Sequence, residues 1–315
     1  MHNENGYMLF AGTSHPELAR QIADSVGVKL GKVTIETFPD GEIGVHVLDN
    51  VRGRDVFLLQ SVARHPNLYL MELLILVDAM KRASARSIIA MIPYFGYARQ
   101  DRKGTAREPI TAKLVADLLE KAGVTRVLSM DLHTEQIQGF FNIPVDNLYA
   151  RPALVEAVKR LKMDKCVVVT PDVGSIKLAR SFAEELKCDY AIVDKRRISA
   201  KRVEMDALIG DVKDCDVLIV DDICSTGSTL KTAAVVCKNA GAKRIYAVVT
   251  HGLFVGESFE ESAIEKMLVS NTVTLPPGIP RERIEVVSIA PLFAKAIDSI
   301  VGAKSISSLF SRSSS

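Results

Sequence analysis

The sequence predicts an α/β protein with two domains, each a mainly parallel β-sheet flanked by helices. Segments rich in Val and Ile alternate with amphipathic segments along the whole chain. Strands with continuous apolar runs are typical of parallel sheets that helices cover on both faces. The length of 315 residues corresponds to about two domains. A boundary near Ala150 would give domains 1–149 and 150–315 with a similar alternation of strands and helices, and we expect the last helix to pack back on the first domain.

Short apolar runs mark the strands, and longer amphipathic runs mark the helices. The predicted strands are Met8–Ala11, Val33–Phe38, Val56–Gln60, Ser87–Ile92, Val127–Met130, Cys166–Thr170, Ala191–Asp194, Val217–Val220 and Ile245–Thr250. The predicted helices are Pro16–Val26, Leu68–Ala83, Ile110–Ala122, Pro152–Leu161, Ile176–Leu186, Thr229–Asn239 and Pro291–Val301. In such sheets, ligands bind at the carboxyl ends of the strands, so we expect binding residues directly after the strands.

The overall composition excludes several classes of protein. Apolar residues make up 48% of the chain and charged residues 25%, with a net charge of +2, which favours neither a nucleic-acid nor a membrane partner. The five cysteines are odd in number and have no C-x-x-C spacing, which argues against a disulfide framework or a structural zinc site. The N-terminus lacks the features of a signal peptide, and the longest apolar stretch is too short to span a bilayer. We therefore expect a cytoplasmic protein.

The segment Val217–Thr229 carries the strongest signal of a binding site. A buried apolar run is followed by Asp221 and Asp222, then by a hydroxyl-rich loop with Gly227 that leads into a helix. The amino end of a helix attracts phosphate through its N–H groups and its dipole. The carboxylates would repel a phosphate but suit sugar hydroxyls or a divalent cation. The segment therefore predicts a site for a phosphorylated sugar, although a capped strand–turn–helix junction with solvated acids has the same pattern.

Three other strand ends carry polar groups. Asp131 and His133 share a face if the extended geometry continues past their strand, and His133 could bind a metal or a phosphate or be structural. Asp172 lies in a tight turn where it could hold a cation or a hydroxyl, and Ser175 could cap the following helix. The cations of Asp194–Arg197 could neutralise a polyphosphate or form a solvated loop.

The N-terminal half offers two further segments. Phe38–Glu42 is a turn between strands with an aromatic ring and two acids. Pro93–Lys103 combines aromatic rings with Arg, Gln and Asp, which suits stacking and edge recognition of a purine. The alternative is a loop anchored by its aromatic residues, with a charged rim. The chain has neither a G-x-x-x-x-G-K-[ST] loop nor a convincing G-x-G-x-x-G motif, so if ATP binds, it binds by another architecture.

Together these segments, with Asp131–Phe141, resemble in order the signatures of ribose-phosphate diphosphokinase, the phosphoribosyl diphosphate synthetases, in its common phosphate-dependent class. The resemblance runs from about Met8 to Phe310. It implies two phosphoribosyltransferase-like domains, the first for nucleotide and subunit contacts and the second for ribose 5-phosphate. The implied reaction is transfer of a diphosphoryl group from ATP to the 1-hydroxyl of ribose 5-phosphate, which gives phosphoribosyl diphosphate and AMP for nucleotide biosynthesis.

The resemblance also implies a role for individual residues. Lys195 and Arg197 would be catalytic and stabilise the transition state. The ATP-binding residues would be Phe38, Asp40, Gly41 and Glu42, from a neighbouring subunit, with Arg99, Gln100 and Asp101. Those that bind ribose 5-phosphate would be Arg197, Asp221, Asp222, Ser225, Thr226, Gly227, Ser228 and Thr229. His133 and Asp172 would bind Mg²⁺. An allosteric site would use Asn50, Arg52 and Arg102.

The implied assembly is a homo-oligomer built from dimers, with a hexamer as the expected form, activated by inorganic phosphate and inhibited by ADP. No nucleic-acid or membrane partner is expected.

One departure from the family pattern falls in the sugar-phosphate loop. The family's loop usually has a third Asp where this chain has Ser225, and a Gly where it has Ser228. Ser225 keeps a hydroxyl without a charge, so we expect the 5-phosphate site to persist. Pro39 stands where Ser or Asn is frequent, and we expect little effect.

Two alternatives to an active synthetase follow from the residues. The first is a non-catalytic regulatory paralogue, which the Ser225 departure supports and the retained Lys195, Arg197 and His133 oppose. The second is a phosphoribosyltransferase, which shares the ribose-phosphate loop. That class commonly needs one such domain and would leave the Arg99–Asp101 segment without a role.

Overall fold

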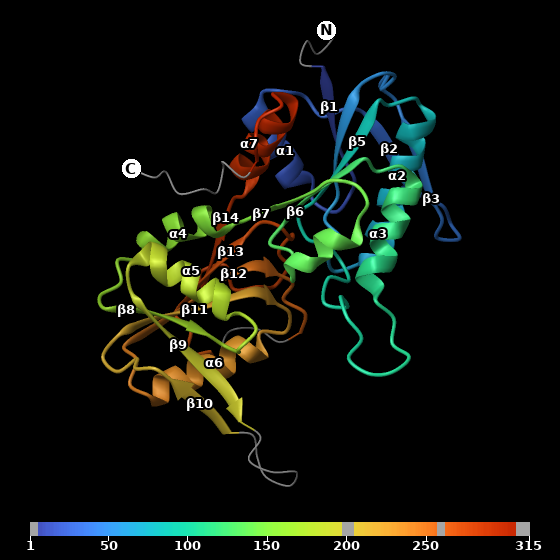
Figure 1. Cartoon of the computed structure of the whole chain (residues 1–315). Coiled ribbons are helices and arrows are strands. Elements are labelled where there is room, and N and C mark those ends of the chain that lie inside the picture. The colour runs from blue at the N-terminus through green and yellow to red at the C-terminus, as the bar shows by residue number, and fades with distance from the viewer. Residues whose placement is uncertain (1–5, 197–204, 257–261, 307–315) are drawn as a thin grey trace. The chain divides into compact units, whose positions relative to one another are not determined.

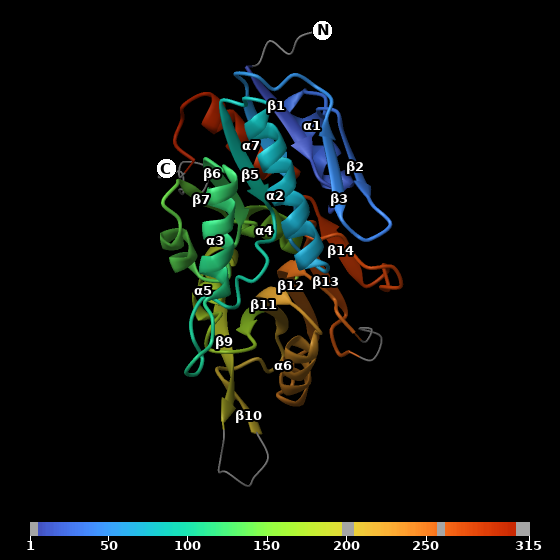
Figure 2. The same cartoon turned by 90° about the vertical axis from the view of Figure 1, so that its right-hand side faces the viewer.

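Parallel sheets form the centre of both halves of the chain (Figures 1 and 2). The computed structural model describes residues 6–196, 205–256 and 262–306, with only the backbone at 195, 196, 205 and 206. Within these ranges, unit 1 comprises residues 6–149, 272–274 and 289–306, and unit 2 comprises residues 150–271 and 275–288. The chain thus leaves unit 1 after Tyr149 and returns to it for its last helix.

Unit 1 contains a five-stranded parallel sheet with the order β1-β4-β5-β6-β7, and an antiparallel hairpin of β2 and β3. Its strands are β1 Tyr7–Ala11, β2 Val33–Thr37, β3 Ile43–Val47, β4 Asp55–Leu59, β5 Ser87–Ile92, β6 Arg126–Met130 and β7 Val145–Leu148. Its helices are α1 Pro16–Val26, α2 Pro66–Arg82, α3 Thr111–Ala122, the 3₁₀ helix η1 Glu135–Phe140, and α7 Ala290–Val301.

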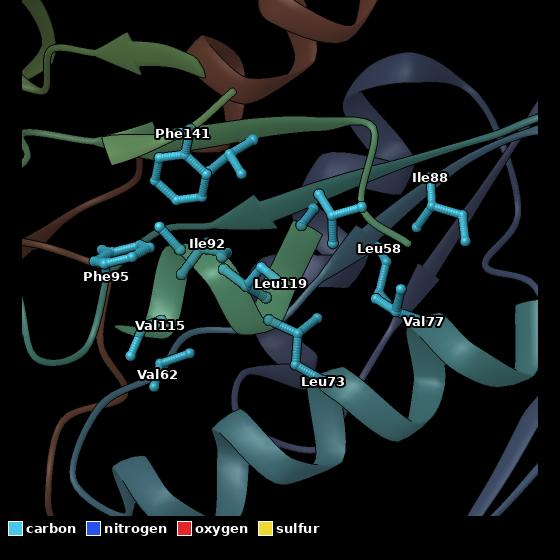
Figure 3. Close-up of a cluster of buried hydrophobic side chains, with 14 of the residues drawn as sticks. Leu58, Val62, Leu73, Val77, Ile88, Ile92, Phe95, Val115, Leu119 and Phe141 are labelled. Carbon is cyan, nitrogen blue, oxygen red and sulfur yellow. The ribbon is translucent and has the colours of Figure 1, made fainter. Parts of the chain in front are cut away.

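The core of unit 1 lies between its sheet and helices α2 and α3. Figure 3 shows Leu73 and Leu119 from these helices close to Leu58 and Ile92 of the sheet. All of these side chains are buried, and so is Phe57, the residue before Leu58. Because successive strand residues point to opposite faces, both faces of the sheet are covered. On the chain's return, α7 packs against α1, as Figure 1 shows in red and blue.

A buried carboxylate joins two strand ends of unit 1. Glu72 of α2 is 2% exposed. It accepts hydrogen bonds from the Thr13 N–H at 2.6 Å and hydroxyl at 2.6 Å, and from Nε2 of Gln60 at 2.7 Å. Such partners offset the cost of burying a charge. A Cβ at position 12 would lie 2.5 Å from oxygens of both Gln60 and Glu72, so this close approach requires Gly12.

Unit 2 contains a seven-stranded sheet with the order β10-β9-β8-β11-β12-β13-β14, parallel except for the β9-β10 pair. Its strands are β8 Cys166–Thr170, β9 Asp189–Arg196, β10 Met205–Ile209, β11 Asp216–Cys224, β12 Arg244–Gly252, β13 Lys266–Ser270 and β14 Ile284–Val287. Its helices are α4 Arg151–Lys159, α5 Ile176–Leu186 and α6 Ser228–Asn239.

The predicted fold class is confirmed, and each predicted helix is present with small shifts at its ends. The prediction that Asp221 and Asp222 follow their strand is wrong, since β11 extends to Cys224. Pairing with β8 ends at Ile219, but pairing with the long strand β12 continues to Cys224. The carboxylates therefore lie on a strand extension with one paired neighbour. Across the described ranges, the helices are too short or too polar to cross a membrane.

Two neighbouring leucines of α3 give a matched test of the core. Leu119 is fully buried, whereas Leu118 is 39% exposed. We expect Leu119→Ala to lower the free energy of unfolding by about 2–5 kcal/mol, because it leaves a cavity under the sheet. Leu118→Ala should change it by less than about 1 kcal/mol. Urea unfolding of both variants measures the difference, and equal losses would contradict the assigned burial.

Candidate functional site

The loop between β11 and α6 presents the amino end of a helix. Gly227 precedes the helix with φ 81°, a conformation that favours glycine, and the Thr226 hydroxyl accepts a hydrogen bond from the Ser228 N–H of the first turn at 3.4 Å. The exposed hydroxyls of Thr226 and Ser228 lie 3.0 Å apart beside it. The carbonyl of half-buried Ser225 accepts a hydrogen bond from Val255 N–H at 2.8 Å, which anchors the loop to the segment after β12. Helix N–H groups and hydroxyls here can together bind an anion.

Asp221 projects from β11 toward the turn that follows β8. Its Oδ1 accepts hydrogen bonds from the Ser175 hydroxyl at 2.8 Å and from the Asp222 N–H at 3.0 Å. The side chain is 9% exposed. The pKa of Asp221 is raised to about 7, chiefly by burial and next by the charge of Asp222, while the Ser175 hydroxyl opposes the rise and Asp172 adds to it. A carboxyl that titrates near neutrality beside a second carboxylate is typical of functional sites.

The turn after β8 is organised around Asp172. Its Oδ1 accepts hydrogen bonds from the Gly174 N–H at 2.8 Å and the Ser175 N–H at 3.2 Å, while the Thr170 hydroxyl donates to its carbonyl at 2.7 Å. The expected capping of α5 by Ser175 is wrong, since the Ser175 side chain makes no cap hydrogen bond and turns to Asp221. The structure thus brings Asp172, Asp221 and Asp222 together, and it adds Ser175 as a supporting residue.

In unit 1, Phe38–Glu42 forms the tip of the β2-β3 hairpin. Glu42 N–H donates to Asp40 Oδ1 at 3.1 Å, and the Phe38 N–H and carbonyl bond to Glu42 and Gly41 within the turn. The Phe38 ring is 44% exposed. If residue 44 carried a Cβ atom, this atom would lie 2.8 Å from the Phe38 ring. The ring therefore packs over Gly44 of the neighbouring strand. The tip therefore offers a partly exposed ring and two exposed acids.

Two of the three aromatic residues after β5 do not present the stacking surface that the sequence favoured, whereas Tyr97 is half-buried. Tyr94 and Phe95 are buried, and Phe95 packs edge-on to Phe141 with ring centroids 6.0 Å apart. They anchor the loop, as the alternative interpretation held. Arg99 and Gln100 remain exposed at its rim.

Asp101 fixes this loop to the next strand end. It is 8% exposed, and its Oδ2 accepts hydrogen bonds from the Thr134 hydroxyl at 2.9 Å and from Nε2 of Gln136 at 3.1 Å. Nearby, His133 is exposed in the segment after β6. Asp131 adopts φ 39°, so the extended geometry expected to place it on one face with His133 ends at the strand. Asp101 thereby places the segments of Arg99 and His133 beside each other within unit 1.

The remaining predicted residues are dispersed. Asn50 and Arg52 are exposed and form a local turn in which Arg52 N–H donates to Asn50 Oδ1 at 3.0 Å; Arg102 is also exposed. The backbone of Lys195 pairs with Asp206 in the β9-β10 hairpin. Arg197 lies outside the described residues.

No cluster of three or more His, Cys, Asp or Glu side chains suited to a metal ion occurs in the described ranges. His133 belongs to unit 1 and Asp172 to unit 2. The acidic group in unit 2 nevertheless fits Mg²⁺, which commonly binds proteins through one or two carboxylates and takes its other ligands from phosphate and water.

Comparison with known proteins resolves the family. Residues 7–123 match the N-terminal domain of ribose phosphate pyrophosphokinase, and residues 144–271 match the phosphoribosyl transferase domain. The ribose-phosphate pyrophosphokinase of Clostridium perfringens is 50% identical over 98% of both chains. The chain belongs to the ribose-phosphate pyrophosphokinase family. Membership confirms the predicted family, whose other name is ribose-phosphate diphosphokinase, and the predicted enzyme class.

Two further relatives agree with this result. The ribose-phosphate pyrophosphokinase of Wolinella succinogenes is 48% identical over 97% of this chain and 99% of the relative. The crystal structure of phosphoribosylpyrophosphate synthetase from Mycobacterium smegmatis superimposes with a TM-score of 0.89 at 38% identity, covering 95% of this chain and 99% of that one. The two-part fold is thus shared over the full length.

The raised pKa of Asp221 predicts a pH-dependent stability. A carboxyl with a pKa of about 7 when folded and 3.8 as its ordinary value costs the folded protein stability as the pH rises between those values. We expect Asp221→Asn to raise the free energy of unfolding relative to wild type. The increase should be a few kcal/mol at pH 8, as the size of the pKa shift implies, and smaller at pH 5. Urea unfolding at both pH values, without Mg²⁺ or phosphate, measures this. An equal effect at both pH values would contradict the assignment.

Proposed function

We propose that the chain transfers the β,γ-diphosphoryl group of ATP to the 1-hydroxyl of ribose 5-phosphate. The hydroxyl oxygen bonds to the β-phosphorus while the bond from this phosphorus to the oxygen of the α-phosphate breaks, which releases AMP. The observation that carries the proposal is the β11-α6 junction, where a carboxylate pair adjoins the amino end of a helix in a ribose-phosphate pyrophosphokinase fold. Such a reaction depends mainly on positioning and charge stabilisation.

Ribose 5-phosphate would bind in unit 2. The residues Ser225–Thr229 would hold the 5-phosphate through the helix N–H groups and their hydroxyls, and Arg197 would add a cation. Asp221 and Asp222 would accept hydrogen bonds from the ribose hydroxyls. The Ser175 hydroxyl and the Asp222 N–H both donate to Oδ1 of Asp221, which orients this carboxyl group.

ATP would bind mainly through unit 1. Arg99 and Gln100 are exposed and can reach the nucleotide, whereas Asp101 would act chiefly by fixing their loop through its bonds to the segment after β6. Phe38 and the acids of the hairpin tip would complete the pocket of a neighbouring subunit. The functional form would then be at least a dimer, with a hexamer built from dimers.

Lys195 and Arg197 would stabilise the charge that develops on the transferred group, because cationic side chains can neutralise phosphate charge. Mg²⁺, when bound with the substrates, would neutralise phosphate charge and bridge phosphate oxygens. His133 and Asp172 would hold it, each in its own unit. Asp172 is already oriented by two backbone N–H groups, so it needs little reorganisation to offer its second oxygen.

Regulation would follow the family. Inorganic phosphate would activate and ADP inhibit at an intersubunit site to which the exposed residues Asn50, Arg52 and Arg102 contribute. A cytoplasmic location is part of the same proposal.

An AMP-release assay tests the reaction. We expect AMP only when ATP, ribose 5-phosphate, Mg²⁺ and inorganic phosphate are all present, and we expect Lys195→Ala to lower the rate by orders of magnitude, about 10²-fold or more. Lys213→Ala is the matched control, since Lys213 is an exposed cation just before β11 and far from the strand's carboxyl end. It should retain the wild-type rate.

Failure of the purified wild-type protein to form AMP would leave the regulatory paralogue as the better interpretation. Release of diphosphate that depends on a nucleobase would instead favour a phosphoribosyltransferase. Near-normal activity of Lys195→Ala would remove its proposed role in the transition state.

Ser225 allows a separate test of the sugar-phosphate loop. We expect Ser225→Asp to leave the rate unchanged or to raise it modestly, because it restores the residue usual in the family at a half-buried position beside the helix start. Ser225→Ala is the control for loss of the hydroxyl. Steady-state kinetics with varied ribose 5-phosphate measures both. A large loss in Ser225→Asp would show that this site has adapted to the hydroxyl.

A further inference from the structure

Two cysteines of unit 2 lie opposite each other at the amino ends of neighbouring strands. Strand β8 begins at Cys166, and β9 begins one residue after Cys188. The parallel register pairs Val167 with Asp189. One step back in this register, Cys166 faces Cys188, and the two thiols are close enough for each to shift the pKa of the other.

This arrangement suits a disulfide bond. Neighbouring strands of a sheet are about 4.8 Å apart, within the Cα separation of about 4.4–6.8 Å that disulfides require. Because facing residues of neighbouring strands project to the same side of a sheet, both side chains lie on the same side. Both residues are half-buried and reduced, so a small oxidant can reach them without unfolding the sheet.

The two sulfurs are chemically unequal. The pKa of Cys188 is lowered, chiefly because the Cys166 thiol donates a hydrogen bond to it, and the Val168 N–H adds a second one. The pKa of Cys166 is raised, since it is the donor and is also partly buried. Asp189 opposes the lowering at Cys188, and Asp216 and Cys215 add to the rise at Cys166. Because the thiolate is the reactive form of cysteine, Cys188 is the nucleophile of the pair.

We propose that Cys166 and Cys188 form a reversible dithiol–disulfide site that hydrogen peroxide oxidises. The Cys188 thiolate attacks a peroxide oxygen, the O–O bond breaks, and hydroxide leaves, which gives a sulfenic acid. The Cys166 sulfur then attacks this sulfenic sulfur, the S–O bond breaks, and hydroxide departs with the thiol proton as water. In total, two thiols and one peroxide give one disulfide and two waters.

The other cysteines serve as internal references. Cys224 and Cys237 are buried, and burial raises the pKa of each to about 12, so both should resist peroxide. Cys215 is half-buried and close enough to influence Cys166, so it is the competing partner. The disulfide would close the segment 166–188, which contains β8, the Asp172 turn and α5.

Thiol titration of the full-length protein after peroxide treatment, followed by peptide mapping without reductant, tests the site. The chain has five cysteines. We expect two to be lost (5 − 2 = 3 remaining), a Cys166–Cys188 linked peptide, and full recovery with dithiothreitol. Cys166→Ser should accumulate a sulfenic acid at Cys188, which dimedone labels. Cys237→Ser should still form the linked peptide.

The decisive comparison is Cys188→Ser, which should keep its four remaining thiols under the same treatment. Loss of two thiols in that variant, or a Cys166–Cys215 peptide in the wild type, would overturn the assignment. Retention of all five thiols in the wild type under peroxide that oxidises free cysteine would overturn it as well. We also expect the oxidised wild-type protein to melt at a higher temperature than Cys166→Ser after the same treatment, because only the wild type can form the bond.

Discussion

Parallel pairing of β8 with β11 is the constraint on which the proposed sugar-phosphate site of unit 2 depends. The pairing stops at Ile219, while β11 continues along β12. Residues 221 and 222 therefore extend past the end of β8, where the turn around Asp172 approaches them. Two backbone N–H groups hold Asp172 in that turn, and the Ser175 hydroxyl reaches Asp221. Burial raises the pKa of Asp221, and the neighbouring carboxylates add to the rise. The electrostatics of the site thus follow from unequal strand lengths.

Unit 1 organises its strand ends by a different device. There, Glu72 is buried and fully surrounded by donors from the residues after β1 and β4. Asp101 does the same between the segments after β5 and β6. A buried acceptor with several donors holds loops in one arrangement, since losing any partner leaves a polar group unsatisfied. The exposed residues of these loops, such as Arg99 and Gln100, are thereby presented from a fixed base.

The sequence predicts local features well and those that depend on partners less well. Helices were found by periodicity, and the Gly227 turn by its composition, because both are encoded within a few residues. The extension of β11 to Cys224 was not predicted, because only pairing with β12 stabilises it. Strand β7, with Asp146 and Asn147 among its four residues, also has little intrinsic β-propensity and forms by pairing with β6. The contact of Ser175 with Asp221 spans two strands and leaves no local signal.

The burial of Tyr94 and Phe95 shows a related limit. An aromatic cluster after a strand can be a binding surface or an anchor for the loop. Which role it has depends on the residues that pack against it. Here Phe141 supplies that partner from a later segment. Arg99 and Gln100 of the same loop are exposed, whereas burial excludes the stacking role that composition favoured for Tyr94 and Phe95.

The return of α7 to unit 1 has a consequence for the order of synthesis. A ribosome delivers α1 among the first residues of the chain and its packing partner among the last. Unit 2 emerges almost entirely in between. The apolar face of α1 therefore stays uncovered by α7 until most of the chain has been synthesised. Unit 2 can complete its sheet first, although N-terminal domains commonly fold first during translation. Unit 1 thus contains both the first and the last helix of the described residues.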